Sequence, residues 1–341
     1  MQSALDVRSL FERVYCTRQT GVLTRGMTSR AIPTAVASAP ADPGWMIAFL
    51  ASLARDDLAP ATLRGYRYDL RHFLAWHRTV QDSPFTIEGL AEYELIAYRQ
   101  HMVAAGRRPA TINRRLDALR RLCRWARGTG TLRADAAGNV RPMRTIRNRQ
   151  PVGLTDVEIH ALLRAAGASS HGLAARNYAL VQLMLQAGLR VGEVAALKVS
   201  DVTTNNRSGS VRIRQGKGLK ARDVPLNATA RRALKQHLDH RQPSQDAPLF
   251  ISSRETAMPV RTIQSVIASI ARRARLKRVA VSAHTLRHTF ALGYLRDNPG
   301  KLLELAGLLG HESLDTTVVY TRPSRDDLAA DLERSHLNVD G

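Results

Sequence analysis

The chain of 341 residues contains little cysteine and no long apolar run. Cys16 and Cys123 are its only cysteines, and two such distant residues can by themselves form neither a disulfide framework nor a zinc site. No apolar run approaches the length that spans a bilayer, and residues 1–30 lack the apolar core of a signal peptide. These features predict a protein of the reducing cytoplasm that has no membrane partner.

Acidic residues are also scarce relative to basic ones. The chain has 29 Asp and Glu against 51 Lys and Arg, a formal net charge of +22. Such an excess favours a polyanionic partner, most often nucleic acid, with a charged membrane surface as the alternative. A hydrophobic content of 44% with 23% charged residues is typical of a folded chain, and the length predicts two domains.

Residues 1–44 read as an N-terminal extension and linker, and residues 45–135 as a helical domain with an internal echo. Residues 60–62 read Pro-Ala-Thr and recur as residues 109–111, a period of 49 residues. We therefore expect two helices that share a start and a packing pattern, with Thr62 and Thr111 as their N-caps.

Each of these helices carries a basic stripe beside its apolar one. The stripes comprise Arg64, Arg67, Arg71, Arg120, Arg124 and Arg127. A stripe of this kind is often only a solvated face. Its repetition in a chain of +22 favours contact with nucleic acid.

Residues 136–150 lose the helical pattern and form a basic interdomain linker. The capping box of Thr155 and Glu158 then begins a second domain, residues 151–322. Helical patterns are expected at residues 172–187, 227–241, 260–274, 283–297 and 301–309. Residues 210–214 and 221–226 alternate as two strands joined by the turn 216–220. The fold class is mainly α with a small β-hairpin.

Four short segments of the second domain carry chemistry-bearing residues. Residues 188–193 read Gly-Leu-Arg-Val-Gly-Glu, residues 216–218 Gly-Lys-Gly, residues 284–288 His-Thr-Leu-Arg-His, and residues 309–311 Leu-Gly-His with Val-Tyr-Thr at 319–321. Their order and spacing resemble the catalytic domain of the tyrosine recombinases, the family of phage integrases and Xer-type recombinases. The resemblance covers about residues 151–322, and the helical domain before it is similar to the core-binding domain of that family.

The resemblance implies a catalytic set in which every position is filled. Carried over residue by residue, the set is Arg190, Lys217, His284, Arg287, His311 and Tyr320. Glu193 and His288 take supporting positions. One departure is Arg322, where many relatives have a histidine outside the catalytic set.

The chemistry suits these residue types. A tyrosine oxygen can retain the phosphoryl group, here as a 3′-phosphotyrosine, so that rejoining needs no cofactor. Two guanidiniums bind the non-bridging oxygens of the transition state, and Lys217 can protonate the departing 5′ oxygen because the pKa of a lysine can be lowered. His284 and His311 can donate hydrogen bonds or take the tyrosine proton, in an undivided role. A metal pair at His284 and His288 is the weaker interpretation, since no third ligand follows, and no metal is expected.

The implied function is site-specific recombination of double-stranded DNA through a Holliday junction, by a homotetramer on two recombination sites. Accessory DNA-bending or recombinase partner proteins are compatible with it. Leu328, Leu332 and Leu337 in the tail, residues 323–341, predict a helix that docks on a neighbouring protomer. The alternatives are a type IB-like topoisomerase and a catalytically inactive DNA-binding regulator. The sequence leaves open integration, transposon resolution and chromosome dimer resolution.

Overall fold

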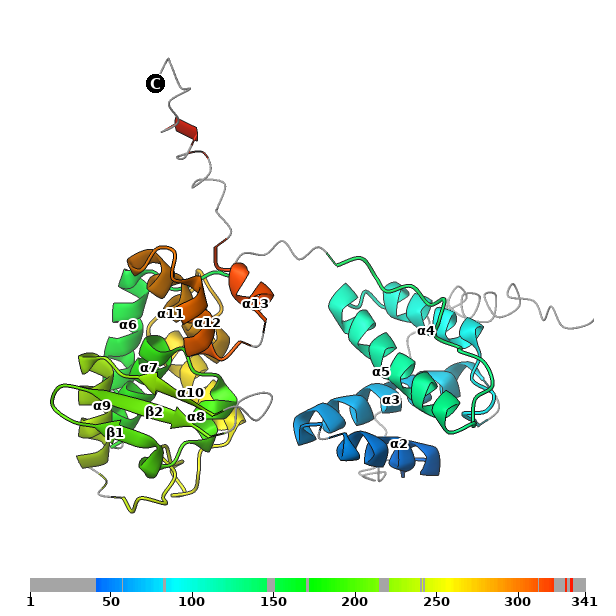
Figure 1. Cartoon of the computed structure of the whole chain (residues 1–341), viewed down its shortest axis with the longest axis horizontal. Coiled ribbons are helices and arrows are strands. Elements are labelled where there is room, and N and C mark those ends of the chain that lie inside the picture. Colours follow the sequence, from blue (N-terminus) through cyan, green and yellow to red (C-terminus); the bar gives the residue numbers. More distant parts are fainter. Residues whose placement is uncertain are drawn as a thin grey trace, which may run out of the picture. The chain divides into compact units, whose positions relative to one another are not determined.

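The computed structural model describes residues 41–56, 58–81, 84–145, 151–169, 172–214, 221–239, 241, 243–311, 313–321, 329, 332 and 333. The chain divides into two compact units, Met1–Arg147 and Asn148–Gly341 (Figure 1). Most of the predicted extension, residues 1–40, lies outside the described residues. Within the described part of the chain, no helix has the length and apolar character needed to cross a membrane.

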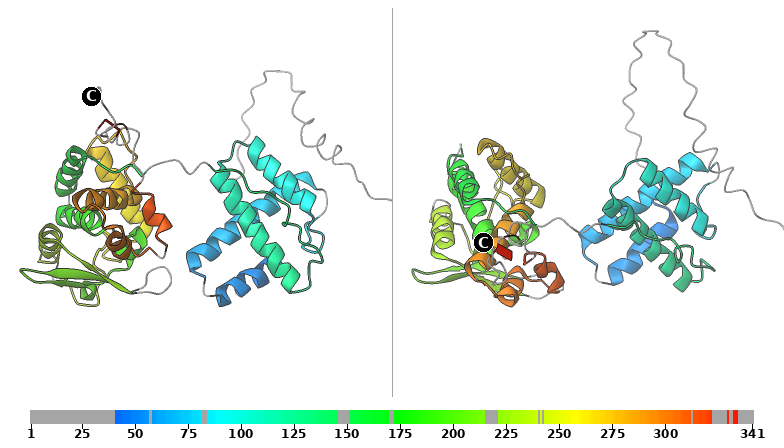
Figure 2. Two further views of the ribbon diagram at one scale, coloured as in Figure 1. Left: turned by 45° about the horizontal axis from the view of Figure 1, so that its top comes forward. Right: turned by 90° about the horizontal axis from the view of Figure 1, so that it is seen from above.

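Unit 1 is helical. Its helices are α2 (Gly44–Arg55), α3 (Pro60–Val80), α4 (Glu92–Ala104) and α5 (Pro109–Gly128) (Figures 1 and 2). The echo of 49 residues corresponds to α3 and α5, and each begins with its proline at the first helical position. The predicted N-caps Thr62 and Thr111 are wrong, because proline fixes a helical φ and has no N–H to satisfy, so each helix starts earlier.

The core of unit 1 includes aromatic side chains from α3, from α4 and from the segment between these two helices. Phe73 meets the rings of Tyr98 and Phe85 edge to face, at centroid distances of 5.2 and 5.3 Å. Ala136, Ala137 and Val140 are buried in the same core. The first part of the predicted linker, residues 136–150, therefore packs as part of unit 1.

A buried polar chain crosses this core. The Arg115 guanidinium donates to Nε2 of His72 at 2.8 Å, and Nδ1 of His72 lies 2.8 Å from the Tyr98 hydroxyl. Arginine can only donate, so Nε2 of His72 is the acceptor and the imidazole is neutral. Burial and then the charge of Arg115 lower the pKa of His72 to about 4.

Unit 2 is built around one buried helix, α7 (Ala174–Ala187). Helix α7 packs against α6 (Asp156–Gly167), α9 (Ala228–Asp239) and α11 (Ala283–Asp297). Thr155 caps α6 by accepting from the amide of Glu158, which confirms the predicted capping box. Helix α10 (Val260–Arg273) lies beside α6 and α8 (Val191–Ala196), and α12 (Leu302–Leu309) follows α11.

A small antiparallel sheet lies along one side of the helices of unit 2 (Figures 1 and 2). Its strand order is β1 (Val202–Thr204), β2 (Gly209–Ile213), β3 (Arg222–Pro225). The predicted hairpin is β2 with β3, in the register Val211 to Val224. Strand β1, only three residues long, was not predicted. The turn that joins β2 to β3 is outside the described residues.

The architecture confirms the predicted fold class of a mainly helical chain with a small sheet. The sheet lies next to the start of α8, because Arg222 on β3 contacts Glu193 on that helix.

Candidate active site

The first arginine of the motif stands where α7 turns into α8. Gly188 ends α7 in the left-handed conformation, with φ of 60°, which favours glycine. An added Cβ there would lie 2.2 Å from the ring of Phe290, so the position has no room for a side chain. Arg190 follows as the N-cap of α8, and its guanidinium donates to Glu193 Oε1 at 3.0 Å and to the carbonyl of Gly310 at 2.9 Å.

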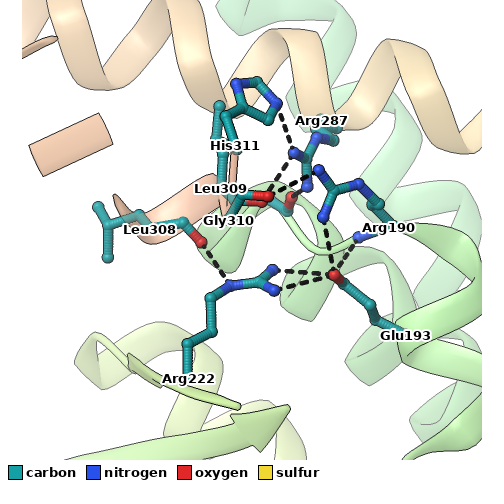
Figure 3. Close-up of polar contacts among 9 residues, drawn as sticks. Arg190, Glu193, Arg222, Arg287, Leu308, Leu309, Gly310 and His311 are labelled. Carbon is teal, nitrogen blue, oxygen red and sulfur yellow. Dashed lines mark hydrogen bonds and ion pairs between the residues drawn. The ribbon is translucent and has the colours of Figure 1, made fainter. Parts of the chain in front are cut away.

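The second arginine projects from α11 and is 4% exposed. Arg287 donates to the carbonyls of Gly188 and Leu309, at 2.7 and 2.9 Å, and to Nε2 of His311 at 2.8 Å. It thereby joins the end of α7 to the end of α12 (Figure 3). Burial, followed by the charge of Arg190, lowers the pKa of Arg287 to about 10, so the side chain remains a cation at neutral pH.

His311 is held by the way α12 ends. Gly310 adopts φ of 63° as the C-cap of this helix and turns the chain so that His311 meets Arg287. Because Nε2 accepts a hydrogen bond from Arg287, the ring carries its proton on Nδ1. That N–H donates a hydrogen bond to Oγ1 of the buried Thr317, 2.8 Å away. Burial and then Arg287 lower the pKa of His311 to about 4, which agrees with a neutral ring.

Tyr320 follows the short helix α13 (Asp315–Val318) and is 8% exposed. Its hydroxyl lies 2.9 Å from Nδ1 of His288, and the ring of His288 lies against that of His284. Burial raises the pKa of Tyr320, although Arg287 and Arg190 act to lower it, so the resting hydroxyl is protonated. Burial and then His284 lower the pKa of His288 to about 4.

One open cavity of about 680 Å³ brings the predicted residues together. Of the six predicted catalytic residues, the five that the structure describes line it: Arg190, His284, Arg287, His311 and Tyr320. His288 lines it as well, and Glu193 lies buried behind Arg190. Lys217, the sixth predicted catalytic residue, is outside the described residues.

Sequence reasoning missed Arg222. This residue donates to both oxygens of Glu193 at 2.9 Å and to the carbonyl of Leu308 at 3.1 Å (Figure 3). The alternation of the strand could have identified it, because residue 222 lies on the same face as Val224 and Leu226, which are buried. A charged side chain on the inner face of a strand requires a partner.

The basic stripes of unit 1 are partly occupied by partners within the unit. Arg67 and Arg71 form ion pairs with Asp42, and Arg127 lies 3.8 Å from Asp135. Arg120 donates to Asp117 and to the carbonyl of Val140.

Two other arginines of these stripes have no such partner. Arg64 and Arg124 are exposed, and neither forms an ion pair with any side chain in the described part of the chain. They are therefore the arginines of the stripes that are open to an outside anion.

Comparison with protein-family models gives two matches that together cover both units. Residues 153–326 match the phage integrase family, and residues 46–130 match the phage integrase N-terminal SAM-like domain.

Known recombinases are similar over most of their length. The tyrosine recombinase XerC of Neisseria gonorrhoeae is 31% identical over 292 residues, which are 85% of this chain and 94% of that protein. The tyrosine recombinase XerD of Ralstonia nicotianae is 33% identical over 281 residues, 80% of this chain and 87% of that protein.

Solved structures share the fold. The XerH site-specific recombinase bound to its difH substrate matches with a TM-score of 0.62 at 23% identity, covering 84% of each chain. A lambda integrase tetramer bound to a Holliday junction matches with a TM-score of 0.62 at 20% identity, covering 79% of this chain and 76% of that one. The chain belongs to the phage integrase family and is a tyrosine recombinase, a site-specific enzyme that cleaves and rejoins DNA.

Proposed function

We propose that Tyr320 is the nucleophile of this recombinase and that Arg190, Arg287, His284, His311 and Lys217 complete its catalytic set. The observation that carries the proposal is the meeting of the Tyr320 side chain and both arginines in one open cavity. Arg190 and Arg287 come from segments 97 positions apart, and a shared cavity of this charge suits a phosphodiester.

The reaction conserves the phosphoryl bond. The Tyr320 oxygen attacks the scissile phosphorus, a P–O bond to tyrosine forms, and the bond to the 5′ oxygen breaks. The tyrosine proton passes to a base in the cavity, and Lys217 supplies a proton to the departing 5′ oxygen. Attack by a 5′ hydroxyl on the 3′-phosphotyrosine reverses these changes and rejoins the strand, so neither a metal nor a nucleotide is called for.

The supporting histidine has a simple role in the resting enzyme. His288 is neutral at pH 7 because its pKa lies near 4, so its Nδ1 can accept a hydrogen bond from the Tyr320 hydroxyl. This contact fixes the rotation of the hydroxyl and turns an oxygen lone pair away from His288. His288 thus orients the nucleophile before DNA arrives.

Assembly follows from the number of cuts. Recombination of two duplexes requires four strand cuts, and one Tyr320 in each protomer means four protomers on two DNA sites. Exchange of one pair of strands and then the other passes through a Holliday junction, as in the lambda integrase tetramer that shares this fold. Accessory DNA-bending proteins or a second recombinase are compatible partners.

Unit 1 takes the role of the core-binding domain and unit 2 that of the catalytic domain, and both are proposed to contact the DNA duplex. Arg64 and Arg124, the exposed and unpaired members of the basic stripes, are the first candidates for phosphate contact. We infer a cytoplasmic site of action, because the chain has only two cysteines, which suits a reducing compartment.

The tail is proposed to join neighbouring protomers. Leu332 is 72% exposed, and most of residues 322–341, with Leu328 and Leu337, lie outside the described residues. The receiving surface we propose is an open groove of about 530 Å³ on unit 2, bounded by Leu226, Phe290, Tyr294 and Leu308. Apolar tail residues of one protomer would cover this groove on the next.

The nucleophile is tested by covalent trapping in cells. Cells that express the full chain are lysed in detergent, and the DNA that is covalently attached to the protein is sequenced. The peptide that carries the attachment is identified by mass spectrometry. The expected peptide carries a nucleotide on Tyr320, the recovered DNA shares one site, and Tyr320→Phe yields no adduct. Attachment at another residue, or an adduct with the phenylalanine variant, would refute the assignment.

A further inference from the structure

The buried carboxylate of Glu193 receives two cations. Its Oε1 accepts from Arg190 and from Arg222, at 3.0 and 2.9 Å, and its Oε2 accepts from the Arg190 backbone amide and from Arg222, at 2.8 and 2.9 Å. Each oxygen therefore accepts from both residues. Figure 3 shows the contacts of Arg190 and Arg222 converging on this carboxylate. Burial raises the pKa of Glu193, but the hydrogen bond from Arg222 and the other contacts lower it more, so the carboxylate is ionised.

Arg222 is itself held from more than one direction. Its side chain is 14% exposed, its Nε donates to the carbonyl of Leu308 in the last turn of α12, and its fork grips Glu193 on α8. The backbone of Gly310 lies against the same guanidinium, because an added Cβ at Gly310 would stand 2.6 Å from Arg222 Nη1. Arg222 does not line the cavity, so it acts on phosphate only through its neighbours.

Charge balance gives this arrangement a consequence. If Glu193 faced Arg190 alone, one carboxylate would offset one guanidinium, and the pair would present no net charge to an anion in the cavity. With Arg222 as the second cation, the three side chains carry one net positive charge. The Arg190 side chain is 34% exposed and lines the cavity, so that surplus charge faces the cavity.

We propose that Arg222 is a positioning residue that neutralises Glu193, so that Glu193 can orient Arg190 without cancelling the charge with which Arg190 binds the scissile phosphate. The inference rests on the proposed role of Arg190 as a phosphate ligand. Its further effect is mechanical, because the bonds to Leu308 and Glu193 join β3, α8 and the end of α12 that leads to His311.

The test measures binding of inorganic phosphate to the full chain, which needs no knowledge of the DNA site. Phosphate is titrated while the ¹³Cε1–H NMR signal of His311, assigned by its loss in His311→Gln, reports occupancy of the cavity. Arg222→Met should weaken phosphate binding by about tenfold, because a charge a few ångströms behind Arg190 is lost in a partly buried site. Arg222→Lys, which keeps the charge, should bind within about twofold of the wild type.

The decisive variant is the double substitution Arg222→Met with Glu193→Gln. Removing the carboxylate restores one net positive charge, so phosphate affinity should return to within about threefold of the wild type. A purely structural Arg222 predicts the opposite, a double variant no better than Arg222→Met. Arg212→Met is the charge-matched control, because Arg212 on β2 forms an exposed ion pair with Asp223 away from the cavity. Its phosphate affinity should be unchanged.

The other outcomes are also decisive. If Arg222→Met does not fold, Arg222→Gln makes the same charge change with a polar head and gives the same comparison. Wild-type affinity in Arg222→Met, or no recovery in the double variant, overturns the inference. If the phosphate results hold but no Tyr320 adduct forms, the proposed nucleophile fails while the role of Arg222 stands.

Discussion

Tyr320 and the side chains around it form a site in which most protons already have an assigned place. Nε2 of His311 accepts a hydrogen bond from Arg287, and Nδ1 of His311 donates one to Thr317. The Tyr320 hydroxyl lies within hydrogen-bond distance of His288. The general acid that we propose for the departing 5′ oxygen is Lys217, which belongs to the motif and lies outside the described residues. This division of labour can be tested one residue at a time.

Lys217→Ala should cleave normal DNA poorly and regain much of its rate when sulfur replaces the bridging 5′ oxygen. A thiolate departs without a proton, so the general acid is no longer needed. The measurement is single-turnover cleavage of the site recovered by covalent trapping, with normal and sulfur-substituted strands. Arg190→Ala should lose on the order of a hundredfold or more in cleavage rate on both strands, since the role that we propose for Arg190 is to stabilise the transition state rather than the leaving group.

Lys220→Ala is the control for this comparison, since it removes the other lysine of the same turn and should behave nearly like the wild type. Rescue of the Lys220 variant would mean that the hairpin lysine has been misassigned. Rescue of neither variant would give the general-acid role to His284 or His311.

Helices α3 and α5 carry the basic stripes of unit 1. They start alike, yet their arginines have different surroundings: Arg64 and Arg124 are open to solvent, whereas Arg120 reaches the carbonyl of Val140. A basic stripe read from helical periodicity thus contains both candidate DNA ligands and structural tethers.

Replacing Arg64 and Arg124 together with alanine should weaken DNA binding. The slope of log affinity against log salt should fall by about one unit for each DNA phosphate that the variant no longer binds. Binding of the full chain to the recovered site is measured at several salt concentrations. Arg120→Ala serves as the comparison, and we expect it to lower the stability of unit 1 while leaving the slope unchanged. Equal slopes for the double variant and the wild type would exclude both arginines from the phosphate backbone.

For the whole molecule, assembly is tested by removing the tail. Truncation after Arg325 should leave binding of one DNA site intact and impair pairing of two sites and recombination, because the proposed docking segment is removed. Binding is followed by gel shift, and recombination by exchange between two labelled duplexes. Normal recombination by the shortened chain would rule out the docking role.

Acid stability is a second property of the whole chain. His72 in unit 1 and His288 and His311 in unit 2 have pKa values near 4, against about 6.5 in an unfolded chain. Between these values the unfolded chain binds protons that the folded chain does not, so stability falls as the pH decreases from about 6.5 towards 4. Each such histidine contributes at most about 1.4 kcal/mol per pH unit.

The two units can be followed separately in this experiment. Trp45, Trp76 and Trp125 are the only tryptophans of the chain and all lie in unit 1, so their fluorescence reports its unfolding, whereas circular dichroism reports both units. Denaturant unfolding is measured at pH 7, 6 and 5. His288→Asn should reduce the pH dependence of the unit 2 transition only, and stability that is flat from pH 7 to 5 would contradict the lowered pKa values.

Local sequence patterns were enough to predict most of the fold. The 3.6-residue period located α7, α9, α10, α11 and α12, and strand alternation located β2 and β3, because these signals depend on near neighbours in the chain. The motif residues likewise predicted five described side chains that line one cavity. The N-cap prediction at Thr62 and Thr111 was wrong although it too was local, since proline at the first helical position took precedence.

The sequence by itself determined the family, most of the helices of unit 2 and five of the residues that line the cavity. Only the tertiary structure decided which partners those residues have. Arg222 meets Glu193 across 29 residues and Leu308 across 86, and Arg190 meets Gly310 across 120. No period or spacing encodes such pairs, because they form only when packed helices and a strand bring buried charges together, and burial then requires each charge to find a partner.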